Sequence, residues 1–274
     1  MSGETETAYA KLNLALHVRE RMEDGYHRIE TLFAFCEDGD ELSAQPQEHV
    51  SVDVEGPFAD QLQGGTNLAW MAADLLLRNR AEPNPNLKRG ASITLTKHLP
   101  VAAGLGGGSA DAAAALRLLN RLWGLRWPLE RLAEIGRELG ADVPACVRSV
   151  PARGTGRGDR LEPVELDLAG TPVLLVNPRV ALPTGEVFAR WDGNDRGPLG
   201  EWREGRNDLM DAATAIVPQI STVLAWLSAQ RGARFVRMSG SGPTCFALFD
   251  GEADRDSAAM AVPREWWRLA TRLR

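Results

Sequence analysis

Alternating hydrophobic and polar residues predict a strand over residues 7–18, close to the start of the chain. Hydrophobic residues from Ala10 to Val18 occupy one face of this strand, while Lys11, Asn13 and His17 fall on the other. A polar face of this kind is either a solvated sheet face or a place where side chains do chemistry, and the alternation alone does not separate the two. Similar patterns predict strands at residues 29–35, twice within 41–55, and at 92–99, 173–176, 235–238 and 244–249, with turns at 24–25, 38–40 and 239–243.

Hydrophobic positions that repeat with the period of a helix predict helices from residue 68 onward. The clearest runs from Ala112 to Trp123, with Ser109 at the position of an N-cap and Gly124 at that of a C′ residue. Thr66 or Asn67 is placed to cap a helix over residues 68–80. The other predicted helices cover residues 128–139, a stretch through 215 that Asn207 and Asp208 cap, residues 218–230, and a tail from 254 that contains Trp266 and Trp267.

Residues 150–159 are rich in glycine and arginine and predict a turn-rich connection. We therefore expect the boundary between two halves of the chain around residues 161–168. The segment from Gly140 to Pro144 is expected to close a helix.

A glycine-rich segment connects the strand over 92–99 to the helix that begins near Ala112. Four glycines within five positions disfavour regular structure, because glycine loses the most backbone entropy on ordering. Such a loop before a helix presents backbone N–H groups to an anion, most often a phosphate. A flexible turn before a core helix is the alternative. The segment consists of Pro100, Val101, Ala102, Ala103, Gly104, Leu105, Gly106, Gly107, Gly108, Ser109, Ala110 and Asp111.

This segment does not match the two common phosphate-binding fingerprints. A Walker A loop requires Lys and then Ser or Thr after Gly108, where Ser109 and Ala110 stand instead. A dinucleotide fingerprint that starts at Gly104 requires a third glycine at position 109 and an acidic residue about 20 positions later, at the end of a strand. Glu130 lies near that distance but begins a predicted helix.

Composition and charge narrow the class of protein. The chain has 274 residues, 44% of them hydrophobic and 25% charged, as expected for a globular protein of one large domain or two ordinary ones. A net charge of −6 and a pI of about 5.4 argue against broad nucleic-acid binding. Cys36, Cys146 and Cys245 show no C-x-x-C spacing and fit reduced thiols. We find neither a signal peptide nor an apolar run of roughly 20 residues, so we expect a cytoplasmic protein without a membrane partner.

Phosphoryl transfer requires groups that the glycine-rich segment lacks. It has no lysine, so a cation is needed from elsewhere, and Lys11 on the first strand is the candidate. A carboxylate is also needed beside the acceptor hydroxyl, and Asp142 is the best placed. The alternative is that Asp142 serves as a cap or turn residue. Asp111 competes for the same role, although its place in the first helical turn is explained by the helix dipole.

Three segments far apart in the chain resemble the three motifs of the GHMP kinase superfamily: Ala10–Leu14, Pro100–Ala114 and Met238–Cys245. Asp24–His27 and Gly140–Pro144 narrow the similarity to the branch whose acceptor is 4-diphosphocytidyl-2-C-methyl-D-erythritol, an intermediate of the non-mevalonate isoprenoid pathway. A loop with three consecutive glycines before the serine, where many relatives have Gly-Ser-Ser, points to the same branch. The resemblance extends from residue 8 to residue 249, nearly the whole chain.

The resemblance implies an α+β fold in two parts. These are an N-terminal ATP-binding domain over residues 1–165, similar to domain 2 of ribosomal protein S5, and a C-terminal α/β substrate domain over residues 166–274, with the active site in the cleft. The implied reaction is transfer of the ATP γ-phosphate to the 2-hydroxyl of the methylerythritol unit, giving the 2-phosphate and ADP. Mg²⁺ is expected because it bridges the β- and γ-phosphate oxygens, but the sequence names no ligand for it. A monomer or a homodimer is compatible with the sequence.

The resemblance also implies a role for individual residues. Asp142 corresponds to the catalytic base and Lys11 to the cation beside it, while residues 100–110 correspond to the ATP-phosphate loop. Asn67 and Lys97 match positions near the nucleoside of ATP. The residues that match the side holding the cytidine diphosphate substrate are Asn13, Tyr26, His27, Thr184 and Phe188.

The chain departs from the family pattern at two places, and other functions stay open. Ala110 replaces a second serine and removes a hydroxyl that would contact phosphate or metal, while residues 153–159 are unusually rich in arginine. One alternative keeps the superfamily but changes the acceptor to homoserine, mevalonate or a sugar. The other is a nucleotide-binding module without catalysis, against which the presence of both Lys11 and Asp142 argues.

Overall fold

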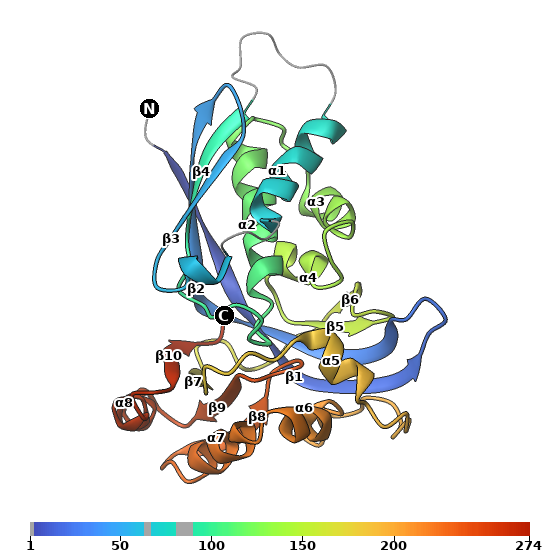
Figure 1. Ribbon diagram of the computed structural model, residues 1–274, viewed down its shortest axis with the longest axis vertical. Coiled ribbons are helices and arrows are strands. Elements are labelled where there is room, and N and C mark those ends of the chain that lie inside the picture. The colour runs from blue at the N-terminus through green and yellow to red at the C-terminus, as the bar shows by residue number, and fades with distance from the viewer. Residues whose placement is uncertain (1–2, 63–66, 81–89) are drawn as a thin grey trace. The chain divides into compact units, whose positions relative to one another are not determined.

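The computed structural model describes residues 3–62, 67–80 and 90–274 (Figure 1). The chain divides into two compact units. Unit 1 consists of Met1–Ala10, Asp38–Val101 and Gly106–Ser149, and unit 2 of Lys11–Glu37, Ala102–Leu105 and Val150–Arg274. The predicted glycine-rich segment is therefore shared: its middle residues, Ala102–Leu105, belong to unit 2 and its two ends to unit 1.

The sheet of unit 1 is built on two long strands, β1 (Glu4–Arg21) and β2 (His27–Gln47), whose residues are divided between the units. In unit 1, β2 pairs antiparallel with β4 (Gly90–Thr96), and β4 pairs parallel with β3 (Ser51–Glu55). A 3₁₀ turn at Ala59–Leu62 follows β3.

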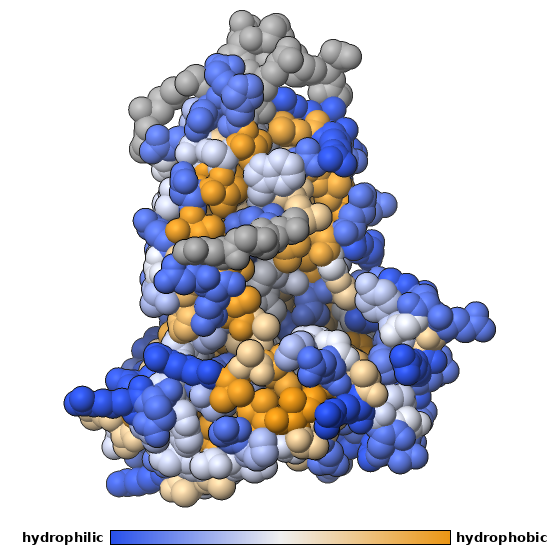
Figure 2. All heavy atoms as spheres, viewed as in Figure 1, coloured by the Kyte–Doolittle hydropathy of each residue, from blue (hydrophilic) through white to orange (hydrophobic). Residues whose placement is uncertain are grey.

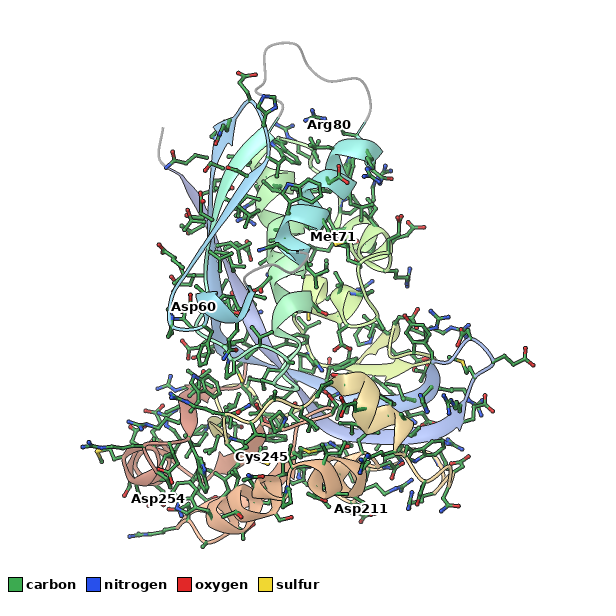
Figure 3. All side chains as sticks on the ribbon, in the orientation of Figure 1. Asp60, Met71, Arg80, Asp211, Cys245 and Asp254 are labelled. Atoms are coloured by element: carbon green, nitrogen blue, oxygen red, sulfur yellow. The ribbon has the colours of Figure 1, made fainter. Side chains whose placement is uncertain are left out.

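Four helices complete unit 1: α1 (Leu68–Asn79), α2 (Gly107–Leu122), α3 (Leu129–Gly136) and α4 (Val143–Arg148). Figure 1 shows α1 and α2 side by side, and Figure 3 labels Met71 and Arg80 along α1 and at its end. Both helices bury several alanines, Ala69, Ala72 and Ala73 on α1 and Ala112–Ala115 on α2. Small side chains let two helices approach closely, so α2, with the glycines at its start, is held firmly by its neighbour.

Unit 2 contains a four-stranded antiparallel sheet in the order β10-β7-β9-β8. Its strands are β7 (Pro172–Asn177), β8 (Ala233–Met238), β9 (Cys245–Phe249) and β10 (Trp267–Arg272). Its helices are α5 (Thr184–Ala189), α6 (Met210–Ile216), α7 (Gln219–Ser228) and α8 (Glu252–Ala261). A short hairpin of β5 (Ala152–Thr155) and β6 (Arg160–Pro163) joins β2 through Thr31–Phe33.

The core of unit 2 lies between its sheet and its helices. It includes Leu174 and Val176 of β7, Ala213 of α6 and Val223 of α7. Figure 3 shows Cys245 on β9 inside the unit and Asp211 of α6 outside it. Hydrophobic residues also reach the surface of unit 2 as a group among hydrophilic ones (Figure 2).

Most of the predicted elements are confirmed, with shifts of a few residues at their ends. The strands at the start of the chain and in the C-terminal half, the α1 and α7 helices and the C′ position of Gly124 all appear in the structure. Asn67 caps α1 as predicted, while Thr66 lies outside the described residues. Among the described helices, none combines the length and hydrophobicity that crossing a membrane would require.

Several predictions about local structure are wrong. Residues 38–40 form no turn but continue β2, because Gly39 lets β2 approach β1 so closely that a Cβ there would overlap the Ala8 carbonyl. Residues 152–155 form β5 rather than a loop, since they gain partners in β2 and β6. Trp267 begins strand β10, paired with β7, rather than continuing a helix. Trp266 is partly buried and packs edge-on against Trp226 beside the core. Helix α4 begins at Val143, where only a helix end was expected.

Candidate active site

The N-terminal turn of α2 is a candidate anion site formed by backbone amides. The helix begins at Gly107, so Ser109 lies in its first turn, and the prediction that Ser109 is the N-cap is wrong. Gly106 takes the N-cap position with φ 63°, a left-handed conformation that favours glycine, and its carbonyl accepts the first helical hydrogen bond, from Ala110 N at 2.7 Å. The amides of Gly107, Gly108 and Ser109 therefore have no acceptor within the helix and point outward at its positive end.

The start of α1 and the segment that precedes α4 both adjoin this turn within unit 1. A Cβ on Gly108 would lie 3.2 Å from Leu68 Cδ1, at the start of α1. Asn67, one residue earlier, uses its Oδ1 to accept hydrogen bonds from Ala69 N at 2.9 Å and Trp70 N at 3.3 Å. On the other side, a Cβ on Gly140 would lie 3.9 Å from Ser109 Oγ. The anion site is thus bordered by the segment that leads directly to Asp142.

Asp142 is half-buried at the N-cap position of α4. The residue lies in a turn at this N-cap position, as the alternative for Asp142 expected, but its side chain makes no capping hydrogen bond to that helix within the described residues. Pro144, near the start of α4, has no N–H to be capped. The carboxylate is therefore not used to begin the helix.

A buried charge cluster lies next to the anion site in unit 1. Lys97 Nζ donates to Asp111 Oδ2 at 2.8 Å and to Asp40 Oδ2. All three side chains are inaccessible, with 1%, 3% and 0% of Lys97, Asp111 and Asp40 exposed. Burial, and the negative charge of Asp40, raise the pKa of Asp111 to about 7, although Lys97 opposes the shift. The expectation that the dipole of α2 explains Asp111 therefore misses its ion pair with Lys97.

In unit 2, Lys11 is held in place by a chain of buried hydrogen bonds. Lys11 Nζ donates to Asn13 Oδ1 at 2.7 Å and lies 5.3 Å from the centre of the Phe33 ring. Asn13 Nδ2 in turn donates to Thr31 Oγ1 at 2.7 Å. Lys11, Asn13 and also His17 are buried, so the alternative of a solvated sheet face is wrong. The second face of β1 is polar because it holds this network.

The glycine turn between β8 and β9 ties the motifs of unit 2 together. Ser239 Oγ donates to Gly104 O at 2.9 Å and accepts a hydrogen bond from Asn13 N at 3.2 Å, so it joins the middle of the glycine-rich segment to β1. Asn207, which was predicted only as a cap, donates from Nδ2 to Met238 O at 2.9 Å and Gly240 O at 2.8 Å. Its Oδ1 also accepts from Leu209 N, but Leu209 itself takes the N-cap position of α6, so the prediction that Asn207 and Asp208 cap this helix is wrong. Sequence reasoning missed Asn207 as a support of this turn, because the partners lie more than 30 residues away.

Three of the predicted substrate residues lie near aromatic or hydroxyl partners in unit 2. The His27 ring lies 5.0 Å from that of Phe188 and 5.7 Å from that of Trp191, a residue that the sequence did not single out. Burial, and to a smaller extent the charge of Arg21, lower the pKa of His27. Thr184 begins α5, and its Oγ1 lies 2.9 Å from Ser241 Oγ.

Tyr26 and the arginine-rich segment form a separate group. The Tyr26 side chain is 53% exposed, and the guanidinium of Arg157 lies 4.0 Å from the centre of its ring. Arg157 also pairs with Asp24. Arg153, by contrast, binds inside unit 2, where it donates to Glu30 Oε2 at 2.7 Å and Leu199 O at 2.6 Å.

The acidic and sulfur-containing side chains near this site offer little to a metal ion. In the part of the chain that the structure describes, no group of three His, Cys, Asp or Glu side chains could hold one. The three cysteines are buried and form no disulfide among the described residues.

Comparisons with known proteins agree with this arrangement. Residues 67–149 match the family model of the GHMP kinases N terminal domain, and residues 189–268 match that of the GHMP kinases C terminal domain. A 4-diphosphocytidyl-2-C-methyl-D-erythritol kinase of Rhizorhabdus wittichii is 54% identical, over 98% of this chain and 94% of the relative. The corresponding kinase of Novosphingobium aromaticivorans is 52% identical, over 98% and 92%. A crystal structure of a 4-(cytidine 5'-diphospho)-2C-methyl-D-erythritol kinase is similar with a TM-score of 0.83 and 34% identity, covering 98% of this chain and 99% of that one.

Proposed function

This chain belongs to the 4-diphosphocytidyl-2-C-methyl-D-erythritol kinases of the GHMP kinase family, and on that premise we propose how its own residues perform the reaction. The enzyme phosphorylates 4-diphosphocytidyl-2-C-methyl-D-erythritol with ATP in the non-mevalonate isoprenoid pathway. The group that receives the γ-phosphate is the 2-hydroxyl, and the products are the 2-phosphate and ADP. The observation that carries the proposal is the junction in unit 1 of the α2 anion site with the Gly140–Asp142 segment.

The first step is to hold the phosphates of ATP. The amides of Gly107, Gly108 and Ser109 donate to phosphate oxygens, and the dipole of α2 favours their negative charge. Residues 100–106 complete the loop. Asn67 and Lys97 contribute on the side of the nucleoside, Asn67 from the start of α1. Because the Lys97 ammonium is occupied by two carboxylates, any direct contact of Lys97 with the nucleoside is made by other atoms of the residue.

The second step concerns the proton of the attacking hydroxyl. Asp142 accepts this proton or orients the hydroxyl toward the phosphorus, and its carboxylate does not serve as the cap of α4. A loose transition state develops little charge on the attacking oxygen, so orientation is a substantial part of this role.

Lys11 provides positive charge for the transferred phosphoryl group. Its ammonium is fixed by Asn13, which is fixed by Thr31, so the charge is already in position when the substrate arrives. Preorganised charge of this kind stabilises the transition state without reorganisation of the protein. Asn13 thus positions Lys11 as well as lying on the predicted substrate side.

The acceptor is held by groups suited to a pyrimidine nucleotide. Tyr26 and Phe188 offer aromatic faces to the cytosine ring, and His27 and Thr184 offer polar edges. The lowered pKa of His27 keeps its imidazole neutral at pH 7, so that one ring nitrogen donates and the other accepts.

We propose that a Mg²⁺ ion would be bound together with the phosphates of ATP. The Ser109 hydroxyl and the Asp142 carboxylate are the protein oxygens that would hold it. When bound, the ion neutralises charge on the β- and γ-phosphates.

Phosphorylation of alternative acceptors tests the proposed function directly. The purified enzyme is incubated with ATP and either 4-diphosphocytidyl-2-C-methyl-D-erythritol, mevalonate or homoserine, and ADP release and phosphorylated product are measured. We expect product with the cytidyl substrate alone. Equal turnover of mevalonate or homoserine would contradict the acceptor assignment, and ATP binding without any phosphorylated product would indicate a binding module.

A further inference from the structure

The Lys97–Asp40–Asp111 cluster joins the two ends of the phosphate loop. Asp40 Oδ1 accepts hydrogen bonds from His98 N at 2.6 Å and Leu99 N at 2.8 Å, the two residues that immediately precede Pro100. Asp40 Oδ2 pairs with Lys97, and Lys97 pairs with Asp111, in the second turn of α2. The backbone before the loop and the helix after it are thus tied to one side chain of β2.

The first turn of α2 lies directly on this cluster. A Cβ on Gly107 would lie 3.6 Å from Lys97 Nζ and 3.8 Å from Asp40 Oδ2. These are ordinary contact distances, so the amide of Gly107 and the cluster are separated by little more than the glycine backbone. Movement of the cluster would therefore move the amides of the anion site.

Stability alone is a weak explanation for such a cluster. Burying an ion pair costs desolvation free energy that is nearly as large as the attraction between its charges. Replacing such a pair with apolar side chains of similar volume often leaves the fold equally stable. With both carboxylates ionised, the cluster carries one net negative charge at a helix end that attracts anions. Asp111 Oδ1 is in addition buried without a hydrogen-bond partner among the described residues. These features make sense for a group that sets the geometry and charge of a ligand site.

We propose that Asp40, Lys97 and Asp111 are positioning residues of the nucleotide site: the cluster holds the loop and the first turn of α2 in the arrangement that binds phosphate, and the charge of Asp111 limits how tightly the nucleotide binds. This inference rests on the proposed function, in which that turn holds the ATP phosphates. None of the three side chains needs to touch ATP to act in this way.

The charge of Asp111 predicts a pH dependence of nucleotide affinity. An ionised Asp111 repels the phosphates, whereas a protonated one does not, so affinity falls as pH rises through about 7. The charged groups that act on Asp111 are Asp40 and Lys97. Among charged residues of neighbouring elements, Asp74 on α1 pairs with Arg78, Arg117 further along α2 with Glu6, and Arg148 on α4 with Glu130.

Two variants separate the effect of the cluster's charge from its effect on the position of the phosphate loop. Asp111→Asn keeps an oxygen for Lys97 and makes the cluster neutral. Lys97→Met combined with Asp111→Asn breaks the ion pair between the strand before the loop and α2, and leaves Asp40 as the one charge of the cluster. The net charge of the cluster in this double variant equals that of the wild-type cluster with both carboxylates ionised. Asp74→Asn, on α1, is the matched control for removing an acidic residue from unit 1.

The test measures ADP binding by calorimetry between pH 6 and 9, with thermal unfolding as a check on folding. We expect Asp111→Asn to bind ADP about tenfold more tightly than wild type at pH 9 and to lack the wild-type fall in affinity through pH 7. Asp74→Asn should follow wild type. An unchanged pH profile in folded Asp111→Asn would overturn the proposal, even if the double variant proved too unstable to assay. Failure of the wild-type enzyme to bind ADP would overturn the proposed function as well.

The double variant tests the positioning role at matched charge. We expect it to bind ADP roughly tenfold more weakly than wild type at pH 9, because a displacement of about 1 Å in a binding group is costly. Inhibition by inorganic tripolyphosphate, which has no nucleoside, should weaken similarly, while the KM for the acceptor stays unchanged. Wild-type tripolyphosphate inhibition in the folded double variant would show that the cluster does not position the phosphate loop.

Discussion

Gly104 is a position where the structure requires glycine for two separable reasons, and this makes a quantitative test possible. Its φ is 74°, and a Cβ there would overlap the carbonyl oxygen of Ser239 and lie 2.8 Å from that of Gly242. The left-handed conformation costs an alanine about 1–2 kcal/mol. The two carbonyls belong to the backbone of a hydrogen-bonded turn, so relieving the overlap costs roughly a further 1–3 kcal/mol.

Gly170 supplies the matched control. It has the same φ of 74°, also in unit 2, but a Cβ there would meet no described atom within 4 Å. Gly170→Ala therefore measures the conformational cost alone, and the difference between the two variants measures the overlap.

Thermal and urea unfolding of both variants decide the matter. We expect Gly170→Ala to lose about 1–2 kcal/mol of unfolding free energy and Gly104→Ala roughly 2–5 kcal/mol. At about 2–4 °C per kcal/mol for a domain of this size, Gly104→Ala should unfold roughly 4–20 °C below wild type. Equal losses in the two variants would refute the reasoning, because they would show that the carbonyls give way without cost.

Two further predictions concern the acceptor side and the buried cluster. Phe188→Ala should raise the KM for the cytidyl substrate by the equivalent of about 1–3 kcal/mol and leave the KM for ATP nearly unchanged, as steady-state kinetics will show; equal shifts of both would make Phe188 a structural residue. The pKa of Asp111 is raised from 3.8 to about 7, so between these pH values the folded protein keeps a proton that the unfolded chain loses. The contribution of this group to the free energy of unfolding is therefore complete below pH 4 and is lost as pH rises through 7. Asp111→Asn should remove this part of the pH dependence of unfolding free energy, on the order of a few kcal/mol, and an unchanged profile in urea titrations would contradict the shift.

Local sequence patterns predicted those helices and strands whose formation depends little on contacts with residues far away in the sequence. The alternation in β1 and the apolar repeat of α1 and α2 depend on residues only a few positions apart, and these elements appear as expected. Asp38–Asp40 shows the limit of such reasoning. A glycine between two aspartates normally favours a turn, but Gly39 is needed for close approach to Ala8, and Asp40 is buried by Lys97. Neither partner is visible in the local sequence.

The same distinction between local patterns and long-range contacts applies to the candidate site. The family motifs located Lys11, Asp142 and the glycine-rich segment, and the structure shows which groups support them. The bond from Ser239 to Gly104 spans 135 residues, and that from Asn207 to Gly240 spans 33. No periodicity encodes contacts at such separations. The start of α2 was misplaced for a different reason: glycine propensity argues against a helix, but the packing of α1 against α2 outweighs the roughly 1 kcal/mol that each helical glycine costs.

Lys11 should show the same functional importance as Asp142, and the two together should not behave independently. Lys11→Met is expected to lower kcat, and the combined variant with Asp142→Asn should lose much less than the product of the separate losses if both residues act on one step. Multiplicative losses in the folded double variant would show that the residues act on different steps.

The central claim is that Asp142 accepts or orients the proton of the attacking hydroxyl, and single-turnover phosphoryl transfer by Asp142→Asn tests it most directly. The substitution keeps size and much of the hydrogen bonding but removes the basic group. We expect the rate of product formation to fall about 10²–10⁴-fold, while ADP affinity, which depends on the α2 turn, stays close to that of wild type. A loss near the lower end would indicate orientation rather than proton abstraction. A near-wild-type rate in a folded Asp142→Asn enzyme would contradict the account.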